Sequence, residues 1–132
     1  MLSLYTIGSY GLSYPNNVNK LSTRNPEQNK TTDNNIQYFK YFEERLIRSE
    51  ETLKNIRKYY RIFRSKNEQN NAEWILNELE TQLSFARNYL KHYRDQRARF
   101  IINRYLTIVE DFIGMNLRGI TNDNRYKNMK NT

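Results

Sequence analysis

Six basic residues lie close together in the middle of the chain, and their spacing suits the binding of phosphate groups. At roughly 100° per residue, five of them fall on one arc of a helix, beside its apolar side. Successive turns then present ammonium and guanidinium groups in one direction, where each can replace a counterion condensed on a nucleic acid. The segment 52–66 contains no acidic residue that would compete for them. The six residues are Lys54, Arg57, Lys58, Arg61, Arg64 and Lys66.

A second basic set lies between residues 87 and 104, where Asp95 is the only acid. This set comprises Arg87, Lys91, Arg94, Arg97, Arg99 and Arg104. The segment 67–86 carries four glutamates and no basic residue, and a helical hairpin would lay it against the first set. Ion pairs between helices are therefore the alternative to a phosphate-binding surface. Pairing cannot neutralise the whole chain, because 22 basic residues against 14 acids leave a net charge of +8. We therefore expect a polyanionic partner, with nucleic acid as the first candidate.

The first 33 residues are expected to form an extended arm. They contain both prolines and two of the four glycines, and their apolar residues keep no helical period. Lys20, Arg24 and Lys30 stand there among Asn, Ser and Thr, whose side chains bind phosphate oxygens without demanding a particular base. The composition predicts an arm that wraps a nucleic acid, and a flexible terminus is the alternative.

Groups suited to catalysis or metal binding are scarce. The 132-residue chain has no Cys and a single His, so it lacks a thiolate nucleophile, a disulfide and a histidine-rich metal site. His92 fits a packed or surface position better than a general base, and neighbouring acids such as Glu110 and Asp111 point to different sides of a helix. No apolar run exceeds three residues, against the roughly 20 that cross a bilayer. The sequence predicts neither an enzyme nor a cofactor or metal site.

The elements that carry these residues are predicted to be helices throughout. Apolar residues recur every three or four positions from Ile36 onward. Ser49, followed by Glu50 and Glu51, looks like a helix N-cap, so we expect a break there. A polar turn is predicted over 65–71, and a slip in the apolar pattern predicts another near 94–96, with Asp95 as the next N-cap.

The predicted fold is therefore all-α. It comprises the extended arm over 1–33, an arm helix over 34–48, and an antiparallel four-helix bundle with a short basic tail over 49–132. We expect glycines 114 and 119 to end the long C-terminal helix and a short last helix to span about 121–129. The lengths fit a bundle of three helices equally well.

The layout of a basic arm before a basic helical bundle is similar to that of a known family, and two stretches share its texture. They are Ser49-Glu-Glu-Thr-Leu-Lys-Asn-Ile-Arg-Lys-Tyr-Tyr and Gln96-Arg-Ala-Arg-Phe-Ile-Ile-Asn-Arg-Tyr-Leu. The chain resembles the major coat proteins of lipothrixviruses, filamentous viruses of hyperthermophilic archaea. The resemblance implies a structural protein of the virion, present in the host cytoplasm during assembly. It also implies a second related coat protein, linear double-stranded DNA clamped between the two, a helical filament of many copies and a lipid envelope outside it.

The resemblance adds an arm helix to the residues expected to contact DNA. Carried over by position, Lys40, Arg45 and Arg48 would wrap the duplex together with the arm. The full set of predicted DNA-binding residues is Lys20, Arg24, Lys30, Lys40, Arg45, Arg48, Lys54, Arg57, Lys58, Arg61, Arg64, Arg87, Lys91 and Arg94.

Two alternatives stay open. The segment 97–106 is similar to the signature helix of the GINS replication-complex subunits, which would make the chain a small DNA-binding or interaction module. Attachment to an anionic membrane surface through the tyrosine-rich N-terminus is the other.

Overall fold

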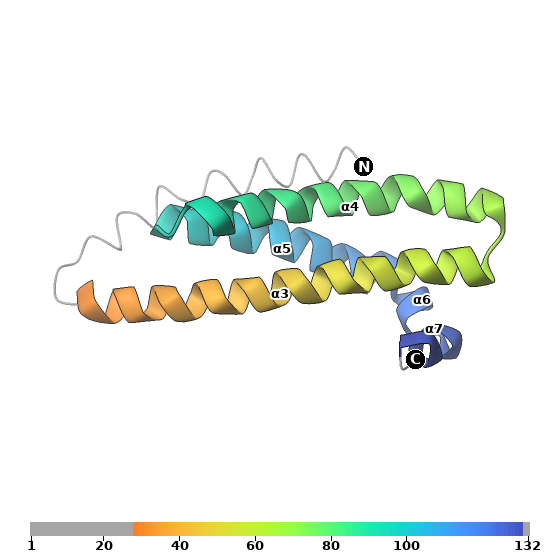
Figure 1. Ribbon diagram of the computed structural model, residues 1–132, viewed down its shortest axis with the longest axis horizontal. Coiled ribbons are helices and arrows are strands. Elements are labelled where there is room, and N and C mark those ends of the chain that lie inside the picture. The colour runs from red at the N-terminus through yellow and green to blue at the C-terminus, as the bar shows by residue number, and fades with distance from the viewer. Residues whose placement is uncertain (1–27, 131–132) are drawn as a thin grey trace.

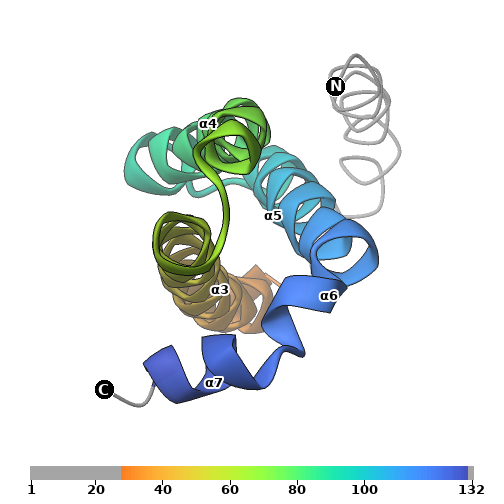
Figure 2. The ribbon, with the colours of Figure 1, turned by 90° about the vertical axis from the view of Figure 1, so that its right-hand side faces the viewer.

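The computed structural model describes residues 28–130, with side chains from residue 36 onward, and this part of the chain is an all-α helical bundle. Three long helices, α3 (Gln28–Phe63), α4 (Lys66–His92) and α5 (Gln96–Asn116), run antiparallel to one another in chain order (Figure 1). Two short helices follow, α6 (Arg118–Thr121) and α7 (Asn124–Lys130). Seen from the end, the long helices form a triangle, and the chain then turns beneath α3 (Figure 2). The predicted fold class is confirmed.

The expected break at Ser49 is wrong, because α3 passes through this position without interruption. Ser49 is only 5% exposed and takes a place in the apolar stripe between Leu46 and Leu53. No Gly or Pro lies between residues 27 and 113 to end the helix. The arm helix and the first bundle helix are therefore one element, which begins at Gln28, inside the segment expected to be extended.

The turn between α3 and α4 is much shorter than the polar segment 65–71 suggested. Ser65 is the N-cap of α4 and forms a capping box, in which its Oγ accepts the amide of Glu68 at 3.2 Å. The backbone amide of Ser65 donates in return to Glu68 Oε1 at 3.4 Å. These two bonds satisfy orphan amides at the helix start, so the polar residues that follow form the first turns of α4.

The predicted turn between α4 and α5 is confirmed. Asp95 caps α5 by accepting the amide of Ala98 at 2.8 Å. At its other end α5 continues through Gly114 to Asn116, because the helical conformation tolerates this exposed glycine. The short last helix exists as α7.

The core runs along the axis of the triangle and holds the long helices together. Leu53, Ile56, Leu79, Ile102 and Leu106 are completely buried at its centre. The short C-terminal helices extend the core beneath α3, where Leu117, Ile120 and Tyr126 are buried. Burial of this apolar stripe fixes which side of each long helix faces solvent.

Candidate nucleic-acid interface

Three cations on the C-terminal half of α3 form a row on its solvent side. Lys54, Lys58 and Arg61 are exposed, and their spacing of four and three residues places them on one side of the helix. The apolar stripe of α3 positions them, since Leu53 and Ile56 turn the opposite side into the core. We call Lys54, Lys58 and Arg61 the α3 cation row.

Arg57 belongs to the same predicted stripe but faces α4 instead. Its Nη1 donates to Glu80 Oε2 at 2.7 Å, its Nε to Glu73 Oε1 at 3.0 Å, and its Nη2 to Asn77 Oδ1 at 3.1 Å. The hydrogen bond with Glu80 is the main cause that raises the pKa of Arg57. A guanidinium held in this way is not available to a phosphate, so the structure removes Arg57 from the predicted surface.

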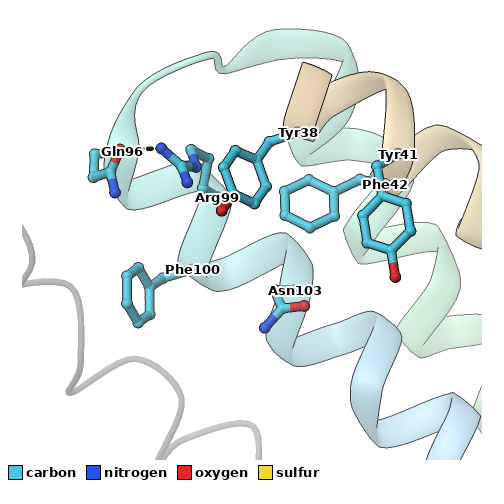
Figure 3. A pocket seen from close by; sticks show the side chains of 7 residues that line it. All are labelled: Tyr38, Tyr41, Phe42, Gln96, Arg99, Phe100 and Asn103. Carbon is cyan, nitrogen blue, oxygen red and sulfur yellow. Dashed lines mark hydrogen bonds between the residues drawn. The ribbon is translucent and has the colours of Figure 1, made fainter. Parts of the chain in front are cut away.

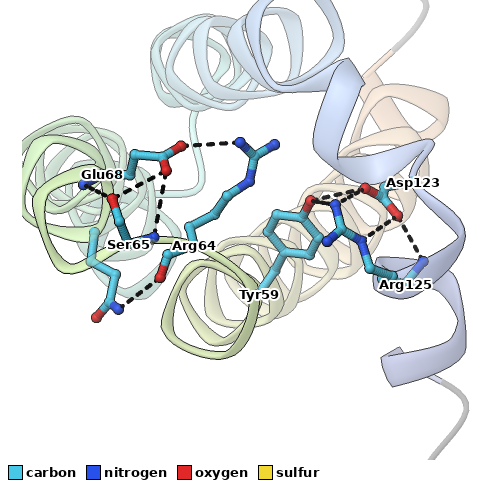
Figure 4. A network of polar contacts seen from close by, with 7 residues as sticks. Tyr59, Arg64, Ser65, Glu68, Asp123 and Arg125 are labelled. Atoms are coloured by element: carbon cyan, nitrogen blue, oxygen red, sulfur yellow. Dashed lines mark hydrogen bonds and ion pairs between the residues drawn. The ribbon is translucent and has the colours of Figure 1, made fainter.

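Arg64 is also engaged, at the end of the row next to the helical turn. Its Nη1 donates to Glu68 Oε2 at 3.0 Å, and its guanidinium carbon lies 5.7 Å from the ring centre of Tyr59. Glu68 is at the same time a partner in the capping box of Ser65 (Figure 4). Arg64 therefore fixes the turn, although both side chains of its ion pair are partly exposed.

These pairings decide the electrostatics of the interface. The glutamates of α4 that lie closest to α3 are bound to Arg57 and Arg64, and Glu50 is bound to Arg87. Within residues 36–130, the α3 cation row forms no ion pair with any carboxylate. Three positive charges are therefore presented to solvent together.

The C-terminal helix docks directly beneath this part of α3. The hydroxyl of Tyr59 donates to Asp123 Oδ2 at 2.9 Å, and Arg125 Nη2 donates to the same hydroxyl at 3.0 Å (Figure 4). Arg125 also bonds Asp123 Oδ2 at 2.8 Å, so the three groups form a closed network. Its hydrogen bonds, chiefly from Arg125, hold the pKa of Asp123 well below its usual range.

This docking adds cations that the sequence did not identify. Lys127 and Lys130 of α7 are exposed, and Lys130 Nζ lies 5.7 Å from the ring centre of Tyr126. The hydroxyl of Tyr126 is hydrogen-bonded to Asn55, which follows Lys54 in α3. The tail therefore brings two further exposed cations close to α3. The surplus charge of the tail was visible in the sequence, but its position relative to α3 was not.

Arg45 lies in the interior and cannot contact DNA as expected. It is 7% exposed, and it donates to both carboxylate oxygens of Glu110, at 2.5 and 2.9 Å. It also donates to Asn103 Oδ1 at 2.7 Å and Thr107 Oγ1 at 3.2 Å. The hydrogen bond with Glu110 raises the pKa of Arg45, so its charge is permanent and serves to join α3 to α5.

Two cations of the second basic set are also engaged within the bundle. Arg87 of α4 pairs with Glu50 of α3. Arg94 donates to the carbonyl of Leu90 and stacks 4.8 Å from the ring centre of Phe39. Arg87 thus forms the kind of interhelical ion pair that the sequence left open as the alternative, whereas Arg94 joins α3 to the end of α4 by a hydrogen bond and a ring contact.

The remaining predicted residues are spread over the molecule. Lys40 and Arg48 are exposed on α3 before the cation row. Glu43 and Glu44 follow Lys40 within about one turn, and Glu51 lies three residues after Arg48 and three before Lys54. Lys91 is exposed near the end of α4. Lys20, Arg24 and the side chain of Lys30 lie outside the described residues.

The described residues present no metal site and no membrane-spanning helix. Among residues 28–130, no group of His, Asp or Glu could hold a metal ion, and His92 is exposed. No helix in this range is long and apolar enough to cross a membrane. In comparisons with protein-family models, curated proteins and solved structures, the chain matches none.

Proposed function

We propose that this protein is a non-enzymatic structural protein that binds double-stranded DNA through its phosphates, without sequence preference. The observation that supports this is the α3 cation row: the α4 glutamates that reach α3 are bound to Arg57 and Arg64, and the three cations of the row form no ion pair among the described residues and are left to meet a polyanion. Backbone contacts of this kind position a protein on a duplex but read no bases.

The geometry allows an estimate of the electrostatic contribution. The row runs from Lys54 to Arg61, seven helical steps of about 1.5 Å or roughly 10 Å, while a duplex carries one phosphate per ~1.7 Å of its axis. If Lys127 and Lys130 join the row, five cations contact phosphates. The slope of log K against log salt is then about −4.5, so affinity falls about 500-fold between roughly 50 and 200 mM salt.

The mode of binding that we propose is coating by many copies. One chain, with its charge of +8, offsets about eight phosphates, or roughly four base pairs. A long duplex therefore needs a row of subunits. Together with the resemblance to lipothrixvirus coat proteins, this supports a coat protein of a filamentous virion, which pairs with a second related coat protein inside a lipid envelope.

Salt-dependent binding to unrelated linear duplexes tests the proposal. Lys58→Gln should reduce the slope by about 0.9, because one phosphate contact is lost. Lys40→Gln is the matched control, since it removes the same charge from the same helix beside two glutamates, Glu43 and Glu44, and it should leave the slope close to wild type. Electron microscopy of the mixture should show filaments whose length follows that of the DNA.

Two results would refute the proposal. One is an absence of duplex binding at moderate salt together with a stable protein complex, which would favour the interaction module. The other is an equal effect of the two substitutions, which would show that the α3 cation row has no special role.

A further inference from the structure

An aromatic pocket lies between α3 and α5, on the half of the bundle that does not carry the α3 cation row. Its volume is about 220 Å³, below the roughly 300–1,000 Å³ that accommodates drug-sized ligands, so it suits a single planar group. The rings of Tyr38, Phe42 and Tyr41 follow one another along the α3 wall (Figure 3). Four residues of α5 complete the lining: Gln96, Arg99, Phe100 and Asn103.

Arginines hold the tyrosines of this wall in place. The guanidinium of Arg99 lies 3.8 Å from the ring centre of Tyr38, and partial burial lowers the pKa of Arg99. The guanidinium of Arg45 lies 5.4 Å from the ring centre of Tyr41 and is itself fixed by Glu110. Tyr41 nevertheless remains 52% exposed, so part of its ring is available for stacking.

The polar groups of the pocket are predominantly hydrogen-bond donors. Gln96 Oε1 accepts from Arg99 at 2.7 Å, and Asn103 Oδ1 accepts from Arg45 at 2.7 Å. A guanidinium has only donors, so each amide must turn its oxygen to the arginine and its NH₂ group away from it. No acidic side chain is among the lining residues. A fitting ligand is therefore flat, aromatic and rich in acceptors.

We propose that this pocket binds one unpaired nucleobase of a single-stranded nucleic acid. Nucleobases stack on aromatic rings and carry carbonyl and ring-nitrogen acceptors along their edges. The exposed cation Arg48, two turns along α3 from Tyr41, is placed to meet the adjoining phosphates. This site goes beyond the proposed coating of duplex DNA and does not depend on it, because the two surfaces share no residue.

The test compares two single-stranded probes by fluorescence anisotropy, an oligothymidylate and an abasic oligomer with the same number of phosphates. The full-length protein should bind the oligothymidylate about 5- to 150-fold more tightly, as expected for stacking of one base. Tyr41→Leu should remove this preference. Tyr93→Leu is the matched control, since Tyr93 is 49% exposed and does not line the pocket, and it should keep the preference.

Asn103→Asp provides a second variant that preserves the fold. The new carboxylate still accepts from Arg45, but the NH₂ donor is replaced by a negative charge, so we expect oligothymidylate binding to weaken. In the wild type, the side-chain amide resonances of Gln96 and Asn103 should shift on titration with oligothymidylate and stay in place with the abasic oligomer.

The proposal is overturned if both probes bind equally well, or if Tyr41→Leu and Tyr93→Leu lose the preference to the same extent. Binding of anionic vesicles that depends on Tyr41, without a preference for the base-bearing probe, would assign the pocket to a membrane surface instead. Failure of the Lys58→Gln prediction for duplex DNA would leave this result unaffected, so the two proposals fail separately.

Discussion

Replacement of Arg45 by Met removes one partner of the most buried ion pair among residues 36–130. The side chain of Arg45 is 8% exposed and that of Glu110 is 35% exposed. Loss of one partner from a buried pair costs about 3–5 kcal/mol, and we expect the lower end, about 3 kcal/mol, because Glu110 regains contact with water. Urea denaturation followed by circular dichroism measures this change in the free energy of unfolding.

A double variant distinguishes the effect of an unpaired buried charge from the effect of replacing residue 45. Removal of both charges in Arg45→Met/Glu110→Leu leaves no uncompensated buried charge, and apolar residues of similar volume often replace such pairs without loss. The double variant should therefore be more stable than Arg45→Met alone. If Arg45→Met unfolds within about 1 kcal/mol of wild type, or if the double variant is no better than the single one, the reasoning about burial is wrong.

Three further predictions concern the ends of the helices. Ser65→Ala removes the capping box and should lower the free energy of unfolding by about 1 kcal/mol in urea denaturation. Tyr59→Phe removes the hydroxyl between Asp123 and Arg125, so amide hydrogen exchange in α7 should accelerate while exchange in α4 stays unchanged. Because the folded pKa of Asp123 is depressed, its stabilising effect is complete above pH ~4 and is lost as the pH falls further, so Asp123→Asn should lose less stability on acidification than wild type.

Local patterns predicted the all-α class and several helix ends. The slip in the apolar period located the turn after Tyr93, and Asp95 identified the residue that caps α5. Ser49 misled for a physical reason: a small hydroxyl residue before two glutamates has the chemistry of an N-cap, but it also fits a core position. The stripe on both sides of it decides between the two, because burial of the whole stripe outweighs one local cap.

The fate of the arginines depends on partners that are distant in sequence. The sequence predicted a helical hairpin, and with it ion pairs between the first basic set and the glutamates that follow. The pairs of Arg57 with Glu73 and Glu80 are of this kind. Arg45 of α3 binds Glu110 of α5, 65 residues away, and no local sequence pattern predicts how α5 is rotated against α3. The sequence therefore predicted that some cations would be neutralised but not which ones.

Arg57 occupies carboxylates that could otherwise pair with the exposed cations near it. Arg61 and Glu73 line the same depression between α3 and α4, and among the described residues Glu73 forms its ion pair with Arg57. Loss of Arg57 would leave Glu73 and Glu80 without this partner, and Glu73 could then pair with Arg61 and neutralise one charge of the α3 cation row. Arg57 can thus influence how strongly the α3 cation row attracts an anion without contacting that anion itself.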